Sequence, residues 1–302
     1  MCEWEGKGMR HLLPALWVFA LLNSAGVPHA ESTTVIGVLA GEEQWLPLAA
    51  ALAKRIDHED GLRILPILGA GSLQALDDLS ALPHIDAAIV TADSLAYAQR
   101  QKLGAIKINY LARLGTANVV LVARQGIANV TALAGKRIAT GPAESAGFAT
   151  GELLFNALEI PFLRVPLQGE KAVAALLAGK ADAALVLVDD IPKAALSDGK
   201  FRVLTLTVPP QLADVYQAAT LTAQDLPGLL PGGRSVDSIS TTLALAVVNW
   251  PRNSAHFSTL QRFDAQLLKL PNAQEFSSDI QGWVRSAAAA TPTTITPTGG
   301  EP

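Results

Sequence analysis

The sequence predicts two doubly wound α/β lobes joined by a two-stranded hinge, and three observations support this fold class. Short apolar segments alternate with segments of helical periodicity along most of the chain. One block of this alternation, beginning near residue 86, is repeated near residue 182. A long apolar segment, Ile239–Val248, then follows the second block and is interpreted as a strand that returns to the first core. A chain that crosses to a second lobe and returns leaves two strands between the lobes.

The first lobe is predicted from three strands and three helices. Its strand segments are apolar without polar alternation, which is typical of strands covered on both faces. The regular alternation with helices indicates parallel strands and right-handed crossovers. The predicted strands are Thr34–Ala40, Leu62–Leu68 and Asp86–Val90, and the predicted helices are Trp45–Ile56, Leu73–Leu82 and Ser94–Gln101.

The second lobe repeats this order of elements and is predicted by the same periodicities. Its strands are Val119–Val122, Arg137–Thr140, Leu163–Leu167, Ala183–Val188 and Arg202–Thr207. Its helices are Phe148–Leu158, Glu170–Leu177 and Ile191–Leu196. Two further helices, Ser254–Leu270 and Glu275–Ala287, follow the returning strand.

An internal repeat supports two copies of one design. Asp86–Asp93 (DAAIVTAD) matches Asp182–Asp189 (DAALVLVD) at positions that lie 96 apart. Upstream of each, a strand segment contains a proline, Pro66 or Pro166, and is followed by a glycine and then a helix. Similar order and spacing favour duplication over coincidence.

These patterns divide the chain into four parts. Residues 1–30 are expected to be a signal peptide, because Lys7 and Arg10 precede an apolar segment, Leu12–Leu22, that is shorter than the roughly 20 residues of a membrane span. The start of the protein is either Met1 or Met9. Residues 31–118 with 237–287 form the first lobe, residues 119–236 the second, and residues 288–302 a flexible tail. The protein is therefore expected in the periplasm.

The composition excludes several classes of function. The net charge of −4 and the lack of a Lys/Arg cluster argue against a nucleic-acid partner. Only 5% of residues are aromatic, which argues against a site lined by stacked rings. The five histidines lack metal-ligand spacing, so neither a metal nor another cofactor is expected. The single cysteine, Cys2, lies in the predicted signal, so the secreted protein would have no disulfide.

Three pairs of segments resemble type II periplasmic solute-binding proteins, and in particular the TAXI group of receptors that serve TRAP transporters. The pairs are Gly69–Leu76 with Asp86–Asp93, Val119–Arg124 with Leu133–Gly141, and Gly169–Leu176 with Gly179–Ala184. The resemblance implies a monomer that captures a small molecule between two lobes by hinge closure and delivers it to an integral membrane transporter.

Two departures from the TAXI pattern bear on the ligand. Gly41–Trp45 (GEEQW) replaces a glycine-rich turn ending in tyrosines, and Pro142–Phe148 (PAESAGF) replaces Gly-Ser-Gly-Thr at a helix N-terminus. Glu144 would occupy or repel the anion site that such a helix end provides. We therefore expect an apolar or lipid-like ligand. A small carboxylate or amino acid feeding a TRAP permease is the alternative, and a ligand-sensing envelope adaptor is another.

The ligand is expected beyond the carboxyl ends of the strands, where open α/β sheets bind ligands. For Ser72, Ser94 and Asp190 helix capping is an equally good interpretation, and Trp45 is alternatively a core residue. Tyr216 and Arg234 are expected at the surface. The candidate ligand-binding residues are Glu43, Gln44, Trp45, Gly71, Ser72, Thr91, Asp93, Ser94, Glu144, Ser145, Phe148, Gln168 and Asp189.

One segment resembles the nucleophile elbow of a hydrolase. Ala143–Gly147 (AESAG) lies between a strand and a helix, and Asp189 and His256 follow in the order that such a triad requires. Gly141 and Pro142 separate the strand from Ser145, however, so the sharp turn of an elbow is not indicated. An esterase that uses Ser145 is therefore the least favoured hypothesis, and we expect that the protein is not an enzyme.

Overall fold

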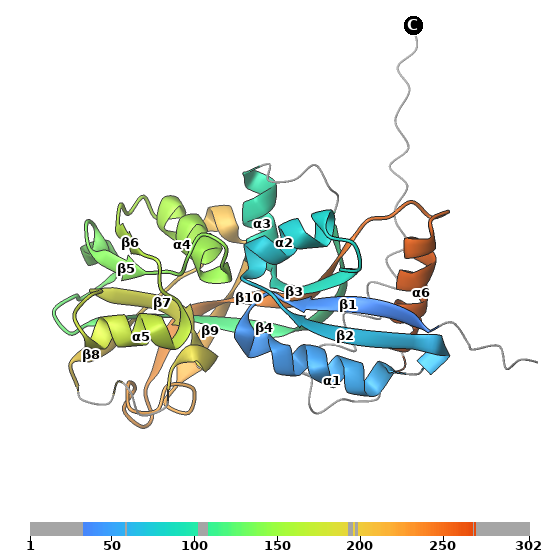
Figure 1. Ribbon diagram of the computed structural model, residues 1–302. Coiled ribbons are helices and arrows are strands. Elements are labelled where there is room, and N and C mark those ends of the chain that lie inside the picture. The colour runs from blue at the N-terminus through green and yellow to red at the C-terminus, as the bar shows by residue number, and fades with distance from the viewer. Residues whose placement is uncertain are drawn as a thin grey trace, which may run out of the picture. The chain divides into compact units, whose positions relative to one another are not determined.

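The computed structural model describes residues 33–57, 59–101, 108–192, 196, 199–267 and 269. Within these residues, ten strands form one sheet in the order β2-β1-β3-β10-β4-β7-β5-β6, with β8 paired to β4 and β9 to β10 (Figure 1). The predicted signal peptide, the predicted helix Glu275–Ala287 and the predicted tail lie outside the described residues. No helix in the described part of the chain is long and apolar enough to cross a membrane.

The first lobe has a parallel three-stranded edge covered on both faces. Helix α1 shows why: Ala49, Leu52, Ala53 and Ile56 repeat at helical spacing and are all buried against the sheet. Helices α1 and α6 cover one face, while α2 and α3 cover the other (Figure 1). The elements are β1 (Thr34–Ala40), α1 (Leu46–Ile56), β2 (Leu62–Leu68), α2 (Ser72–Ala81), β3 (Ala87–Thr91), α3 (Ala92–Arg100) and α6 (Ala255–Leu267).

The second lobe repeats this arrangement. Its parallel strands lie in the order β6-β5-β7, as β2-β1-β3 do in the first lobe. Helix α4 covers one face and α5 the other, and each face has its own apolar core. The elements are β5 (Arg137–Ala139), α4 (Ala146–Ala157), β6 (Leu163–Val165), α5 (Gly169–Leu177), β7 (Ala183–Leu187), β8 (Phe201–Leu204) and β9 (Tyr216–Thr222).

Two long antiparallel strands, β4 (Ile108–Arg124) and β10 (Ser235–Val248), run from one lobe to the other. Strand β10 pairs with β3 of the first lobe at its carboxyl end and with β9 of the second at its amino end. Strand β4 pairs with β7 and β8 through its apolar second half. The predicted fold class, two α/β lobes joined by a two-stranded hinge, is confirmed.

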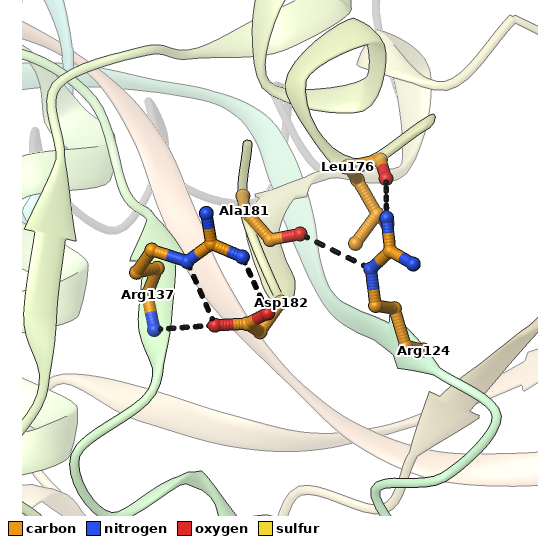
Figure 2. A network of polar contacts seen from close by, with 5 residues as sticks. All are labelled: Arg124, Arg137, Leu176, Ala181 and Asp182. Atoms are coloured by element: carbon orange, nitrogen blue, oxygen red, sulfur yellow. Dashed lines mark hydrogen bonds and ion pairs between the residues drawn. The ribbon is translucent and has the colours of Figure 1, made fainter. Parts of the chain in front are cut away.

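The internal repeat corresponds to the same position in both lobes. Asp86 precedes β3, and its Oδ2 accepts a 3.0 Å hydrogen bond from the backbone N–H of Gly37. Asp182 precedes β7, and its Oδ2 accepts a 3.0 Å bond from the backbone N–H of Arg137. Figure 2 shows that the Arg137 guanidinium also clamps Asp182, while Arg124 donates to the carbonyl oxygens of Leu176 and Ala181. Each aspartate joins the start of its strand to the neighbouring strand.

One predicted helix differs from the structure, and two strand segments were not predicted. The segment predicted as the helix Ile191–Leu196 starts without helical structure, because Val188–Asp190 forms a short 3-10 turn and Ile191 and Pro192 lie outside any helix. Proline disfavours helical backbone at the residue before it, which accounts for the difference; residues 193–195 are outside the described part. Strand β9 and the first half of β4 were not predicted, since neither has a continuous apolar pattern.

Candidate functional site

A cavity of about 50 Å³ lies at the strand ends between the two lobes. The first lobe contributes Glu42 and Gln44, which follow β1, and Thr91, the last residue of β3. The second lobe contributes the first turns of α4 and α5 and the carboxyl end of β7. The crossing strands add Val119 of β4 and Thr241 of β10. A molecule in this cavity would contact both lobes and both connecting strands.

Glu42 joins the lobes at one side of the cavity. Its Oε1 accepts hydrogen bonds from the backbone N–H of Ser72 (3.0 Å) and of Ala146 (2.7 Å). Its Oε2 accepts a 2.9 Å bond from the side-chain amide of Gln168. The side chain is only 4% exposed. Burial raises the pKa of Glu42, and the hydrogen bonds from Ala146, Ser72 and Gln168 counteract this effect.

Asp93 forms a second polar connection between elements of the two lobes. Its Oδ2 accepts hydrogen bonds from the hydroxyls of Thr150 of α4 (2.6 Å) and Tyr216 of β9 (2.9 Å). Asp93 is fully buried, and burial raises its pKa. Tyr216 was expected at the surface but is 2% exposed, because β9 pairs with β10 and turns this side chain toward α3 and α4.

Asp190 is the second acidic residue that lines the cavity. It ends the 3-10 turn that follows β7 and lies against Gly169 at the start of α5. Burial raises the pKa of Asp190 to about 6, and the negative charges of Glu42, Asp189 and Glu170 add to this effect. No Lys, Arg or His is found among the residues that line the cavity.

Several predicted site residues lie in or beside the cavity. Gln44, Thr91 and Gln168 line it directly. Ser72 begins α2 and donates its backbone N–H to Glu42. Gly71, one residue earlier, lies directly against the Glu144 carbonyl oxygen of the other lobe.

The hydroxyls of Ser94 and Thr91 are 2.8 Å apart, and both side chains are buried. Helix α3 begins at Ala92, so Ser94 is its third residue and not its capping residue. Its hydroxyl contacts Thr91, which lines the cavity.

Other predicted site residues lie away from the cavity. Trp45 is 7% exposed and belongs to the core between α1 and the sheet. The side chains of Glu43, Glu144 and Asp189 are exposed and do not line the cavity. The sequence places Glu144 at the anion site of α4, but the carboxylate at that helix end is Glu42, while Glu144 contributes its carbonyl oxygen to the backbone N–H groups of Leu73 and Gln74.

Ser145 and Phe148 have structural partners at the start of α4. The Ser145 hydroxyl accepts a 3.2 Å bond from the Phe148 N–H and donates to the Pro142 carbonyl at 2.8 Å, so Ser145 caps the helix. The Phe148 ring is half-buried, contacts Tyr97 edge-on, and has the Arg164 guanidinium 4.1 Å above its centre.

Ser145 and His256 are not brought together as the triad considered from the sequence would require. His256 stacks on Trp250 and lies 3.8 Å from Asp86, at the amino end of β3. Ser145 instead precedes Ala146, which lines the cavity at the carboxyl ends of the strands. Within the described residues, no three His, Cys, Asp or Glu side chains gather as metal ligands would.

Sequence reasoning missed several cavity residues for one reason. Thr150, Val119 and Thr241 lie inside a helix or a crossing strand, where no strand-end rule points to them. Glu42 belonged to a predicted strand-end segment, but only the fold reveals that its carboxylate meets two helix starts.

No protein-family model matches the chain, and no curated protein sequence is significantly similar to it. Solved structures do match. One, described as a periplasmic transporter, has a TM-score of 0.51 at 14% identity, with 84% of this chain and 91% of that chain covered. Others are MatC from Rhodopseudomonas palustris with bound malate (TM-score 0.49, 20% identity, 77% and 83% covered) and a TctC solute-binding protein from Polaromonas (0.44, 18%, 77% and 87%). The chain therefore shares the two-lobed α/β fold of a periplasmic transporter protein.

Proposed function

We propose that this chain is a periplasmic solute-binding protein, which captures a small molecule between its lobes and delivers it to an integral membrane transporter. The observation that carries the proposal is the cavity lined by both lobes and both crossing strands. Contacts from both lobes to one ligand stabilise the closed arrangement over the open one. A membrane partner then recognises the closed form.

Within this class we propose the type II arrangement and, more narrowly, the TAXI group that serves TRAP transporters. The two strands that cross between the lobes support the type II arrangement. The segments that resemble TAXI receptors include Gly69–Leu76, whose glycine and serine begin α2 beside Glu42.

The protein binds its ligand without reacting with it. The only nucleophile that the sequence singled out, Ser145, uses its hydroxyl to cap α4, and its hydrogen-bond partners are the backbone groups of Pro142 and Phe148. A base that would activate this hydroxyl has to lie within hydrogen-bond reach, and His256 contacts Trp250 and Asp86 instead.

The cavity favours a compact ligand with an apolar part. Val119, Leu185 and Leu187 provide apolar wall, in line with the apolar ligand expected from the sequence. A cavity needs a volume of roughly 10–15 Å³ to hold one water molecule, so a cavity of about 50 Å³ accommodates a group of only a few atoms. A long acyl chain exceeds this volume, and we therefore propose a small molecule in place of a lipid.

Native mass spectrometry of the purified protein, followed by organic extraction, tests the proposal. We expect a co-purified small molecule, or one from a panel of amines, alcohols, carboxylates and fatty acids, to bind at a stoichiometry of one and to raise the melting temperature. Gln44→Trp should weaken this binding at least tenfold, because Gln44 lines the cavity. Glu43→Trp, at the exposed neighbouring position, should leave it unchanged.

A protein to which no member of the panel binds would contradict the proposal. So would binding that is insensitive to Gln44→Trp, because the ligand would then lie outside the cleft.

A further inference from the structure

The carboxylate of Glu42 lies where two helices begin. Ser72 is the first residue of α2, and Ala146 is the first residue of α4. The backbone N–H groups of both residues donate to the same oxygen, Glu42 Oε1, at 3.0 and 2.7 Å. Helix N-termini carry free N–H groups and a partial positive charge, which together stabilise an anion. The chain thus supplies its own anion to this position.

The second oxygen of Glu42 is also satisfied from within the chain. Gln168, which precedes α5, donates its side-chain amide to Oε2. Three donors from three segments therefore hold one carboxylate that is 4% exposed. A ligand carboxylate could enter this position only by displacing Glu42, and it would then lie close to a second negative charge.

The rest of the cavity is also acidic. Among the described residues that line it, Asp190 is the only ionisable one besides Glu42. Two of the donors to Glu42 are N–H groups at helix starts, whose partial positive charge compensates the charge of this carboxylate. The negative charges of Glu42, Asp189 and Glu170 instead repel a negative charge on Asp190. A positively charged group beside Asp190 would relieve this repulsion, and an anion there would add to it.

Resting on the proposed function, we propose that Glu42 acts as a built-in anion that excludes carboxylate ligands, and that Asp190 selects a small ligand carrying a positively charged amino group on an apolar body. The amino group would lie beside Asp190. The apolar body would contact Val119, Leu185 and Leu187.

A series of probes that differ only in charge tests the ligand class: n-butylamine, 1-butanol and butyrate, titrated calorimetrically at pH 7.5 and constant ionic strength. We expect butylamine to bind at least tenfold more tightly than butanol, and butyrate not to bind. Asp190→Asn should lower the butylamine affinity at least tenfold. The matched variant Asp77→Asn, at an exposed position of α2 outside the cavity, should change it less than threefold.

Chemical rescue tests the role of Glu42. Glu42→Ala should lower the melting temperature, and acetate should restore it because acetate takes the place of the missing carboxylate between Ser72 and Ala146. Wild type and Glu43→Ala should not respond to acetate beyond the effect of equal chloride. If Glu42→Ala does not fold, Glu42→Gln keeps the side-chain shape without the charge. It should lower the ratio of butylamine affinity to butyrate affinity at least fivefold.

Three outcomes would overturn the proposed ligand class. Butyrate could bind the wild type more tightly than butylamine, Asp190→Asn could leave the butylamine affinity unchanged, or butylamine could fail to bind. Failure of acetate to restore the Glu42→Ala protein, or an unchanged preference in Glu42→Gln, would overturn the role of Glu42. A carboxylate whose binding is abolished by Gln44→Trp would overturn this inference while leaving the solute-binding function intact.

Discussion

The carboxylate of Glu42 and the backbone N–H of Ala146, 104 residues apart in the chain, form a 2.7 Å hydrogen bond that joins the two lobes. Glu42 follows β1 of the first lobe, and Ala146 begins α4 of the second. Hydrogen bonds to charged groups contribute about 1.5–3 kcal/mol each, which offsets part of the cost of burying this carboxylate. Glu42 therefore joins the two lobes and is also one of the two acidic residues among those that line the cavity.

Gly71 of the first lobe lies directly against the backbone of Glu144 in the second, and we expect Gly71→Ala to open the cleft. A Cβ at this position would lie 2.2 Å from the Glu144 carbonyl oxygen, and the three nearest atoms all belong to the backbone of Glu144 and Ser145, which cannot rotate away as a side chain can. The variant should lose about 1–3 kcal/mol of unfolding free energy and gain in radius of gyration, as measured by urea unfolding and small-angle X-ray scattering. Gly126→Ala, whose Cβ would meet nothing within 4 Å, is the matched control. A Gly71→Ala protein as compact as the control would refute the expected opening.

The two aspartates that end the repeated segments should differ sharply in their effect on stability. Asp93 is fully buried and accepts hydrogen bonds from Thr150 and Tyr216, whereas its repeat counterpart Asp189 is exposed. Asp93→Ala removes the acceptor of the buried Tyr216 hydroxyl and leaves Thr150 with only the Ala146 carbonyl oxygen, so it should cost about 2–4 kcal/mol. Asp189→Ala should stay within about 0.5 kcal/mol of wild type. Urea unfolding at pH 7.5 measures both, and equal losses would contradict the different roles.

The repeat in the sequence predicted the arrangement of the fold well, because it marks the same strand in each lobe. Asp86 and Asp182 both join the amino end of that strand to its neighbour, so one residue type meets one physical need twice. The proline match was less informative. Pro66 lies inside β2, where it pairs with Val38 of β1. Strand β6 ends at Val165, so Pro166 lies one residue beyond it and has no paired residue in β5.

The site was only partly predictable, because strand ends are local features and side-chain partners are not. The pattern that places Thr91 and Gln168 after strands is visible in the sequence. The meeting of Glu42 with Ala146 depends on how the two lobes pack against each other, and no local periodicity encodes that arrangement. Tyr216 was misplaced for a similar reason, since its burial comes from the pairing of β9 with β10.

The pH dependence of stability should report on Asp190. Its pKa is about 6 in the folded protein and 3.8 in the unfolded chain, so the folded state holds this proton more tightly. Its contribution to stability is therefore present below about pH 4 and is lost as the pH rises through 6, on the order of 2–3 kcal/mol in total. Melting curves from pH 5 to 7.5 should show a smaller fall for Asp190→Asn than for wild type. Glu43→Gln, at an exposed position, should follow the wild type, and identical curves for all three proteins would exclude this role.

Asp182 should stabilise the fold without affecting the cleft. Its carboxylate accepts bonds from the Arg137 backbone N–H, Nε and Nη2 at 2.8–3.1 Å, at the end of β7 opposite the cavity (Figure 2). The side chain is 21% exposed, so we expect Asp182→Asn to lose only about 1 kcal/mol at pH 7.5 and to bind ligand as wild type does.

The hydrogen bond from the Arg137 side chain lowers the pKa of Asp182 below 3.8, so its contribution is present above that pH and is lost as the pH falls further. Asp86→Asn, at the equivalent position of the first lobe, serves as the comparison. Its carboxylate accepts the Gly37 N–H and lies 3.8 Å from His256 but has no arginine clamp, so we expect a smaller loss. Urea unfolding at pH 7.5 and pH 3 measures the difference between wild type and each variant. A loss in Asp182→Asn that does not shrink at the lower pH would show that packing, rather than the ionised carboxylate, is what the substitution removes.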